Sequence, residues 1–249
     1  MKSGLLALLT LLPFWLLGQS DKFSTEAGEL TIHPVLHASM VWEWAGKTLY
    51  FDPYGGAERY AAFPKPDIVF ITHAHGDHLN PETLNGLDLS KAVLVAPESV
   101  VEAMDTELLG AFTQVTTLAN GAIYQWEGVK VEAVPMYNLP NDESARHAKG
   151  WGNGYVLTIG GKRLYVCGDT EDIPEMRNLE AIDVAFVCMN LPYTMDVEAA
   201  ASAVNEFQPK VVYPFHYRGK GGFSDVEAFQ RLVNAGAPEV EVRLRQWYD

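Results

Sequence analysis

The chain has 249 residues, of which 48% are hydrophobic and 20% charged, a composition typical of a globular protein and too apolar for a disordered one. Its 18 lysines and arginines against 32 aspartates and glutamates give a formal net charge of −14. Such a surface repels phosphate backbones and anionic lipid headgroups, so nucleic-acid binding is not expected. A small anionic substrate is still compatible with this charge, because a bound metal ion inverts the potential of a cleft.

The first 20 residues differ in composition from the rest of the chain. An apolar run over residues 5–17 follows Lys2 and ends before small residues. The run is short for a membrane span and contains Pro13, so it predicts a secretory signal peptide over residues 1–20. The alternative is an uncleaved N-terminal anchor. We expect a periplasmic or secreted protein in which residues 21–249 form a single domain, with no stable membrane span after cleavage.

The rest of the chain alternates strands with turns and helices, and an irregular polar stretch occupies residues 138–154. Two sheets packed on each other, with helices outside, are the economical architecture for this pattern. Strands are predicted over 30–44, 48–52, 67–72, 92–96, within 121–136, and over 155–159, 162–166, 182–187 and 210–213, and helices within 80–110 and over 195–207 and 226–233.

Only two cysteines occur, Cys167 and Cys188, each at the end of a strand-like run. Disulfide bonds therefore do not hold this fold together. Two buried thiols and a single bridge between them are both compatible with the sequence.

The strongest chemical signal is the segment THAHGDH, residues 72–78, directly after a buried strand. In an extended loop, alternation sends His73, His75 and Asp77 to one side, and a turn at the glycine brings His78 round to the same cavity. Borderline divalent ions prefer imidazole together with carboxylate. The segment therefore predicts a metal centre.

This segment resembles the HxHxDH signature of the metallo-β-lactamase-fold hydrolases, and the resemblance extends over nearly the whole chain after the predicted signal peptide. Asp52 resembles the aspartate that ends an early strand and braces the metal loop. Asp169 resembles the bridging carboxylate, and His216 resembles the last histidine. Residues 37–39 and 193–195 resemble the branch that contains the ascorbate-6-phosphate lactonase. The resemblance implies an α+β fold, a four-layer αββα sandwich with the metals at one edge.

The resemblance also implies two divalent metal ions and their ligands. Zinc is expected first because imidazoles dominate the ligand set, and manganese second because the carboxylates supply hard oxygen atoms. By the resemblance, His73 and His75 bind the first ion, Asp77, His78 and His216 bind the second, and Asp169 bridges both.

One ligand of the family pattern is missing from its usual place. Most members have a third histidine for the first ion after the strand that here ends at Met136, where this chain has none. We predict that His147 substitutes for it, so that its segment is both ligand and lid; Asn138 or water are the alternatives. His37 is expected near the site as a hydrogen-bond donor.

Two such ions hold a bridging water as hydroxide facing an electrophilic carbon or phosphorus. Asp77 and Asp169 orient it, and a carboxylate takes up a proton as the intermediate collapses. No GxSxG elbow, P-loop or GxGxxG fingerprint occurs. We therefore expect a metal-dependent hydrolase that acts on a small molecule: a lactone, an ester or a phosphodiester. Arg146, Lys149 and Lys220 are candidates to contact an anionic group, or are ordinary solvated charges.

Three alternatives accompany this prediction. One is a metal-binding protein of the same fold without hydrolytic activity, which the missing histidine favours. The second is a metallo-β-lactamase. The third is a di-iron redox protein, but that branch carries additional carboxylate ligands and a flavodoxin domain, and this chain has neither.

Overall fold

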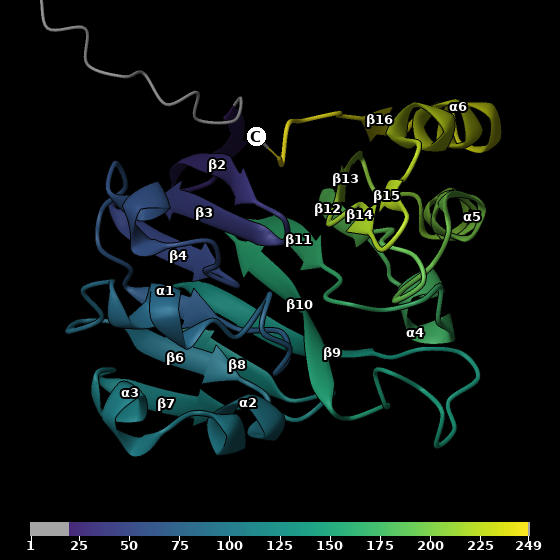
Figure 1. Ribbon diagram of the computed structural model, residues 1–249. Helices are drawn as coiled ribbons and strands as arrows, with labels where there is room; N and C mark the ends of the chain where they lie inside the picture. The colour runs from purple at the N-terminus through teal and green to yellow at the C-terminus, as the bar shows by residue number, and fades with distance from the viewer. Residues whose placement is uncertain (1–19, 249) are drawn as a thin grey trace, which may run out of the picture.

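Residues 20–248 are described by the computed structural model and form two mixed β-sheets packed face to face (Figure 1). All but the last residue of the predicted signal peptide lies outside this described part. No helix within it is both long and apolar enough to cross a membrane. In spatial order, the first sheet consists of β1 (Asp21–Thr25), β2 (Gly28–Leu36), β3 (Ser39–Trp44), β4 (Lys47–Phe51), β5 (Ile68–Phe70), β6 (Val93–Ala96) and β7 (Gln114–Thr117).

The second sheet is built by the later part of the chain. In spatial order, its strands are β16 (Glu241–Val242), β13 (Val211–Phe215), β12 (Val184–Cys188), β11 (Lys162–Val166), β10 (Gly152–Ile159), β9 (Val129–Met136) and β8 (Ile123–Trp126). Strands β8 to β11 pair antiparallel, whereas β11, β12, β13 and β16 pair parallel. A separate hairpin joins β14 (Arg218–Gly219) to β15 (Gly222–Phe223).

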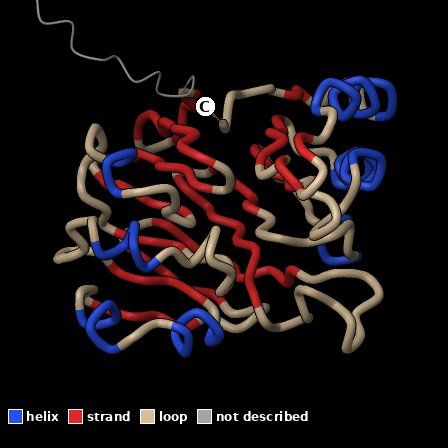
Figure 2. The backbone as a smooth tube through the Cα atoms, in the orientation of Figure 1, coloured by secondary structure: helices blue, strands red, loops and turns tan. Residues whose placement is uncertain are grey.

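Helices cover the outer face of each sheet, as the blue segments on either side of the strands show (Figure 2). Leu84, Val100 and Leu108 pack with the outward side chains of the first sheet, and Val204 and Phe229 pack on the second. These layers form an αββα sandwich, so the predicted fold class is confirmed. The helices are η1 (Ala57–Tyr60), α1 (Pro81–Asn85), α2 (Glu98–Ala103) and α3 (Thr106–Gly110) in the first half, and α4 (Pro174–Arg177), α5 (Val197–Phe207) and α6 (Val226–Gly236) in the second.

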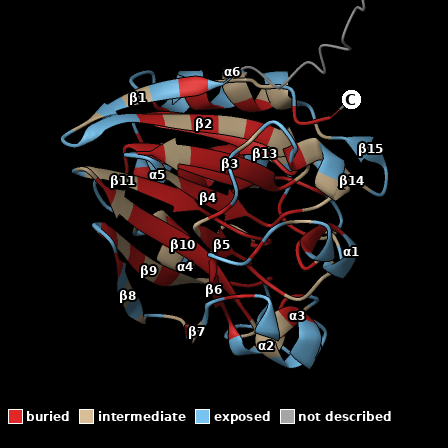
Figure 3. Cartoon of the chain, turned by 90° about the vertical axis from the view of Figure 1, so that its left-hand side faces the viewer, coloured by how far each residue is buried: buried red, intermediate tan, exposed pale blue. Residues whose placement is uncertain are grey.

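Aromatic rings fill the space between the two sheets. The ring centroids of Trp42 and Phe186 lie 5.7 Å apart, and those of Phe70 and Tyr155 lie 5.3 Å apart, so both pairs join one sheet to the other. The central strands are buried on both faces (Figure 3). A core of this kind is closely packed and holds the loops at the strand ends in fixed positions.

The structure differs from the predicted elements in places where the apolar pattern is weak. The run predicted as one strand over residues 30–44 is two strands, β2 and β3, because the chain turns at His37, whose φ is 60°. Strands β1, β7 and β16 were not predicted; they lie at sheet edges, where exposed residues interrupt the apolar pattern. Cys167 and Cys188 are both free and buried.

Candidate metal centre

Strand ends bring four distant segments to one edge of the sandwich. Asp52 follows β4 and the segment 72–78 follows β5, and these two strands are parallel neighbours. Asp169 follows β11 and His216 follows β13, which both run parallel to β12. The carboxyl ends of parallel strands share an edge of the sheet, which is where α/β proteins place ligands.

Three histidines form a first cluster at this edge. His73 Nε2 lies 3.1 Å from His75 Nδ1, which in turn lies 3.2 Å from His147 Nε2. Asp169 Oδ2 lies 3.6 Å from His147 Nε2. His73 and His147 are fully buried, whereas His75 is partly exposed. Converging nitrogen atoms of this kind suit one metal ion with histidine ligands.

A second cluster lies on the other side of Asp169. Its Oδ1 atom lies 3.1 Å from His216 Nε2 and 3.3 Å from His78 Nε2, and the two imidazole nitrogens are 3.1 Å apart. Asp77 Oδ2 lies 3.7 Å from His216 Nε2. The donor set of two imidazoles and two carboxylates suits a divalent ion.

Unpartnered buried atoms test whether this site fits metal ions. Asp169 Oδ1 is buried and accepts no hydrogen bond within the described part of the chain. An ionised carboxylate in that position is costly unless a cation compensates it. The imidazole nitrogens around it face one another, and His216 Nε2 also lies 3.2 Å from the amide nitrogen of Asn190. The residues therefore fit divalent metal ions.

Neighbouring side chains orient the histidines. Asp52 Oδ2 accepts hydrogen bonds from His78 Nδ1, at 2.7 Å, and from Thr72 Oγ1, at 2.8 Å. Thr72 Oγ1 in turn accepts from His73 Nδ1 at 3.1 Å. These hydrogen bonds place the proton of each ring on Nδ1 and leave Nε2 free to face the cluster. Asp52 is thus a brace for the loop, as its resemblance implied.

Asn138 orients His147 and is not in the cluster itself. Its Oδ1 atom accepts hydrogen bonds from His147 Nδ1, at 3.0 Å, and from the His147 backbone, at 2.8 Å. Its Nδ2 atom donates to Glu171 Oε1 and to the backbone oxygen of Tyr193. His147 is fully buried, so this part of the segment is fixed in the core rather than placed as a movable lid.

Burial and neighbouring charges set the protonation of these groups. Burial holds the pKa of His73 well below its ordinary value and lowers the pKa of His147 to about 4, so both rings are neutral near pH 7. Burial alone would raise the pKa of Asp169, but His216 and His78 outweigh it and keep that pKa well below the usual range. Neutral imidazole and ionised carboxylate are the protonation states that bind metals, so His73, His147 and Asp169 are ready to bind. The neighbouring carboxylates raise the pKa of His78 well above its ordinary value, so this ring would lose a proton when a metal ion binds.

Glycines allow the close packing around the site. A Cβ atom on Gly168, whose φ is +65°, would lie 2.8 Å from Met136 Sδ. A Cβ atom on Gly152 would lie 2.9 Å from His73 Cβ. Both positions therefore require glycine for the strand ends to reach the metal loop.

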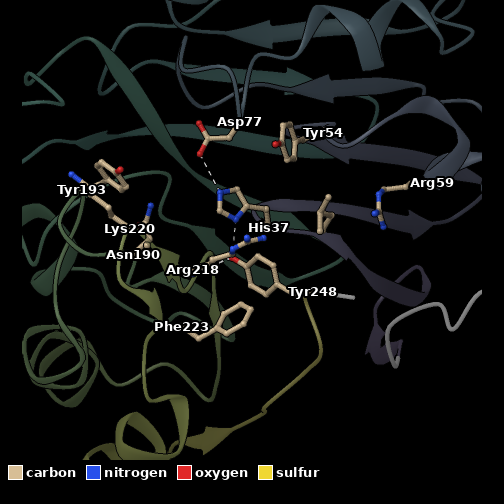
Figure 4. A pocket seen from close by; sticks show the side chains of 12 residues that line it. His37, Tyr54, Arg59, Asp77, Asn190, Tyr193, Arg218, Lys220, Phe223 and Tyr248 are labelled. Atoms are coloured by element: carbon tan, nitrogen blue, oxygen red, sulfur yellow. Dashed lines mark hydrogen bonds and ion pairs between the residues drawn. The ribbon is translucent and has the colours of Figure 1, made fainter.

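His37 connects Asp77 to the end of the chain. Its Nε2 atom donates to Asp77 Oδ2 at 3.1 Å, and its Nδ1 atom accepts from Tyr248 Oη at 2.8 Å (Figure 4). Burial lowers the pKa of His37 to about 4, in agreement with a neutral ring. His37 therefore donates a hydrogen bond beside the site, as expected from the sequence. The sequence analysis did not identify Tyr248 as a residue near the site. The only signal for Tyr248 was the aromatic pair that it forms with Trp247 near the chain end.

The sequence of this chain is similar to those of several known proteins. The family described as a β-lactamase superfamily domain matches residues 31–216. A UPF0173 metal-dependent hydrolase of Thermococcus kodakarensis is 30% identical over 218 residues, which cover 82% of this chain and 92% of the relative. One from Staphylococcus carnosus is 27% identical over 213 residues, with the same coverage of 82% and 92%.

Solved structures share the fold. The crystal structure of a Parabacteroides distasonis protein is 36% identical to this chain, with a TM-score of 0.78, and the match covers 93% of this chain and 100% of that one. A metallo hydrolase from Ignicoccus hospitalis has a TM-score of 0.72 at 24% identity, covering 88% of this chain and 96% of that one.

Proposed function

Because the chain belongs to the β-lactamase superfamily, as a UPF0173 metal-dependent hydrolase, we propose that it binds two divalent metal ions and cleaves a lactone, an ester or a phosphodiester. The observation that carries this proposal is the position of Asp169. Its Oδ1 atom faces His78 and His216, whereas its Oδ2 atom faces His147. A single carboxylate between two groups of histidines is suited to bind both proposed metal ions, one with each oxygen atom.

The proposed ligands divide between the two ions. Bound divalent ions acidify water and polarise the bond that is cleaved. Zinc suits the site because five of the seven ligands are imidazoles, and manganese is the second choice. In this proposal, His73, His75 and His147 hold the first ion, Asp77, His78 and His216 hold the second, and Asp169 holds both.

Asp77 is the proposed proton acceptor. Burial alone would raise its pKa, but the charge of His78 and the hydrogen bond from His37 keep that pKa well below the usual range, so Asp77 is ionised. It lines the open pocket, where its carboxylate can orient the attacking hydroxide and take up a proton as the intermediate collapses. His37 holds Asp77 Oδ2 in place for this transfer.

Lactones and phosphoesters come before β-lactams among the proposed substrates. The support is the resemblance of residues 37–39 and 193–195 to the lactonase-like branch, together with the bridging position of Asp169. A panel of lactones, carboxylic esters, phosphodiesters and β-lactams tests this order. Preferred turnover of β-lactams would make the protein a metallo-β-lactamase instead.

The Asp169→Asn variant tests the dinuclear centre. It keeps the shape of the side chain but loses its charge, so we expect the metal content to fall from two ions per chain to one or fewer. We expect kcat to fall at least ~100-fold, as when a group that acts in the transition state is removed. Elemental analysis and initial rates measure the two effects.

The control is Asp183→Asn, which removes a carboxylate just before β12, away from the cluster, where it pairs with Lys210. Activity and metal content should both match the wild type. Wild-type turnover in Asp169→Asn would contradict the proposal. Two bound ions without turnover of any substrate would favour the metal-binding protein without activity.

The location of the protein is part of the proposal. The pattern of residues 1–20 supports export to the periplasm or the medium, with a mature chain that starts at Asp21. Fractionation of the native cells and mass spectrometry of the purified protein test this. An intact N-terminus in the cytoplasmic fraction would contradict it.

A further inference from the structure

The cationic side chains of this protein are unevenly paired. Most lysines and arginines within residues 20–248 lie within 4.0 Å of a carboxylate. Lys149 is one of these, since its Nζ atom lies 2.5 Å from Glu175 Oε1. Within that described part, no ion pair with a carboxylate involves Arg146, Arg218 or Lys220. In a chain with a net charge of −14, cations without such partners are the exception.

These three cations gather around one opening of the protein. Arg218 and Lys220 line a pocket of about 550 Å³ that also contains Asp77 in its wall (Figure 4). Arg146 lies over the ring of Tyr193, which lines the same pocket, with 4.6 Å between its Cζ atom and the ring centroid. Arg146 also directly precedes His147, whose ring belongs to the first cluster.

The pocket itself is poor in negative charge. Asp77 is the only carboxylate among the described residues that line it, and our proposal assigns that residue to a metal ion. Rings of Tyr54, Phe223 and Tyr248 supply apolar surface beside the cations. A cleft of one charge with apolar walls concentrates ions of the opposite charge even when the net charge of the protein has the other sign.

The hairpin of β14 and β15 positions the two lining cations. Arg218 pairs with Phe223 across the hairpin, and its Cζ atom lies 6.0 Å from the centroid of that ring. Lys220 is at the turn, where its backbone nitrogen donates to Leu191 O at 3.0 Å. A Cβ atom on Gly219 would lie 1.8 Å from the same oxygen, so the hairpin approaches this loop as closely as only glycine permits.

A chain of hydrogen bonds through Tyr248 and His37 links this hairpin to Asp77 of the metal cluster. The backbone nitrogen of Arg218 donates to Tyr248 Oη at 3.2 Å. Tyr248 Oη donates to His37, which donates to Asp77. The cations therefore have a defined position relative to the atoms where hydrolysis is proposed to occur, and a bound molecule of modest size can contact both.

We infer that the substrate carries an anionic group separate from the bond that is cleaved, and that Arg218 and Lys220 bind this group. The inference rests on the proposed hydrolytic function and specifies its substrate class. A carboxylate or a phosphate monoester suits the pair, because guanidinium and ammonium both form charge-assisted hydrogen bonds to such oxygens. The aromatic rings then contact the organic part that joins the anion to the scissile bond.

Binding to the metal-free protein tests the site without any turnover. We would titrate chelator-treated protein with inorganic phosphate and, separately, with succinate by calorimetry, so that the two sources of negative charge are distinguished. Arg218→Gln and Lys220→Gln should each raise the Kd of the tighter ion at least ~10-fold, as expected for the loss of a charge-assisted hydrogen bond. Arg231→Gln is the control, because it removes a positive charge from exposed α6.

Turnover by the metal-loaded enzyme tests whether the site serves the substrate. We would compare para-nitrophenyl acetate with para-nitrophenyl hydrogen succinate, which adds a distal carboxylate. The wild type should prefer the succinate ester at least ~10-fold in kcat/KM, mainly through KM, if one charged contact is gained. In Arg218→Gln and Lys220→Gln this preference should fall, whereas in Arg231→Gln it should persist.

The outcomes separate the inference from the proposed function. If neither anion binds, or if both hairpin variants bind as tightly as the wild type, the inference is wrong whatever the enzyme hydrolyses. An unchanged ester preference in the hairpin variants would also overturn it. If phosphate or succinate binds through the hairpin but no substrate of the panel is cleaved, the anion site stands and the proposed hydrolysis fails.

Discussion

Three buried histidines of the candidate centre each have one acceptor that fixes the ring, whereas His216 Nδ1 is buried without a hydrogen-bond partner among the described residues. Asp52 serves His78, Thr72 serves His73, and Asn138 serves His147. Because the second nitrogen of each ring faces the cluster, these acceptors determine which atom is available to a metal. Changing the acceptor should therefore weaken metal binding even though the ligand itself is retained.

The pair His147 and Asn138 gives a direct test of this dependence. His147→Ala should weaken the binding of one ion and leave the other in place. Asn138→Ala should weaken the same ion ~10–100-fold, the range known for residues that orient a ligand. Competition with a chromophoric chelator measures both affinities.

Asn141→Ala is the matched control for Asn138. Asn141 lies in the same segment but is exposed, and its side chain accepts a hydrogen bond from the backbone nitrogen of Lys149 at 3.2 Å. It should bind both ions like the wild type. Two unchanged sites in His147→Ala would show that the first ion takes another ligand, such as water.

The start of β10 acts as a support for the metal loop. The backbone nitrogen of Asn153 donates to Thr72 O at 2.8 Å, and Tyr155 Oη donates to Ile71 O at 2.9 Å. Gly152 packs directly against His73. Strand β10 therefore holds the segment 71–73 from the second sheet, and the two sheets must stay in register for the site to form.

Gly152→Ala tests this support. The added Cβ atom would lie 2.7 Å from Met136 Sδ and 2.9 Å from His73 Cβ, so either the strand or the loop must shift. We expect a loss of ~1–3 kcal/mol in the free energy of unfolding, the usual cost of overpacking, together with weaker metal binding. Gly110→Ala, where a Cβ atom meets open space at the end of α3, should lower neither quantity. Equal stability of the two variants would show that β10 can shift to accommodate the added methyl group and does not hold the metal loop tightly.

Folding places several histidines where they resist protonation, and this affects the stability of the metal-free protein. The pKa values of His37 and His147 are lowered from 6.5 to about 4, and that of His73 lies well below 6.5, because burial disfavours the charged ring. Below pH 6.5 the unfolded chain therefore binds protons that the folded chain does not. His78 has a raised pKa, since neighbouring carboxylates outweigh its burial, and its effect changes only above pH 6.5.

We therefore expect the chelator-treated protein to lose stability as the pH falls from 6.5 towards 4. Each of the three histidines lowers the free energy of unfolding by roughly 1.4 kcal/mol per pH unit in that interval. Urea denaturation at several pH values measures the slope. His147→Gln should reduce this slope by the contribution of one histidine, roughly 1.4 kcal/mol per pH unit. A slope that is flat in the wild type would contradict the assigned protonation states.

Much of this protein follows from local sequence patterns. Apolar runs with turns between them predict the sandwich, and the segment 72–78 predicts a cluster of metal-binding side chains, because its residues are neighbours in the chain. Asp52, Asp169 and His216 were placed by resemblance, and all three lie at the same edge of the sheets as that segment. Local pattern therefore identified the metal-binding segment that is continuous in the chain, whereas the three separate residues needed the resemblance.

The tertiary structure decided the remaining features, because they depend on contacts between residues far apart in the chain. The turn at His37 depends on a single positive φ, and its link to Tyr248 spans 211 positions. His147 was one candidate among several, and only packing against Asn138 shows that it is buried beside His75. The hairpin that carries Arg218 and Lys220 likewise faces the pocket only because the two sheets pack together. Hydrophobic patterning specifies which face of a strand is buried, but it does not specify which distant loop lies beside that strand.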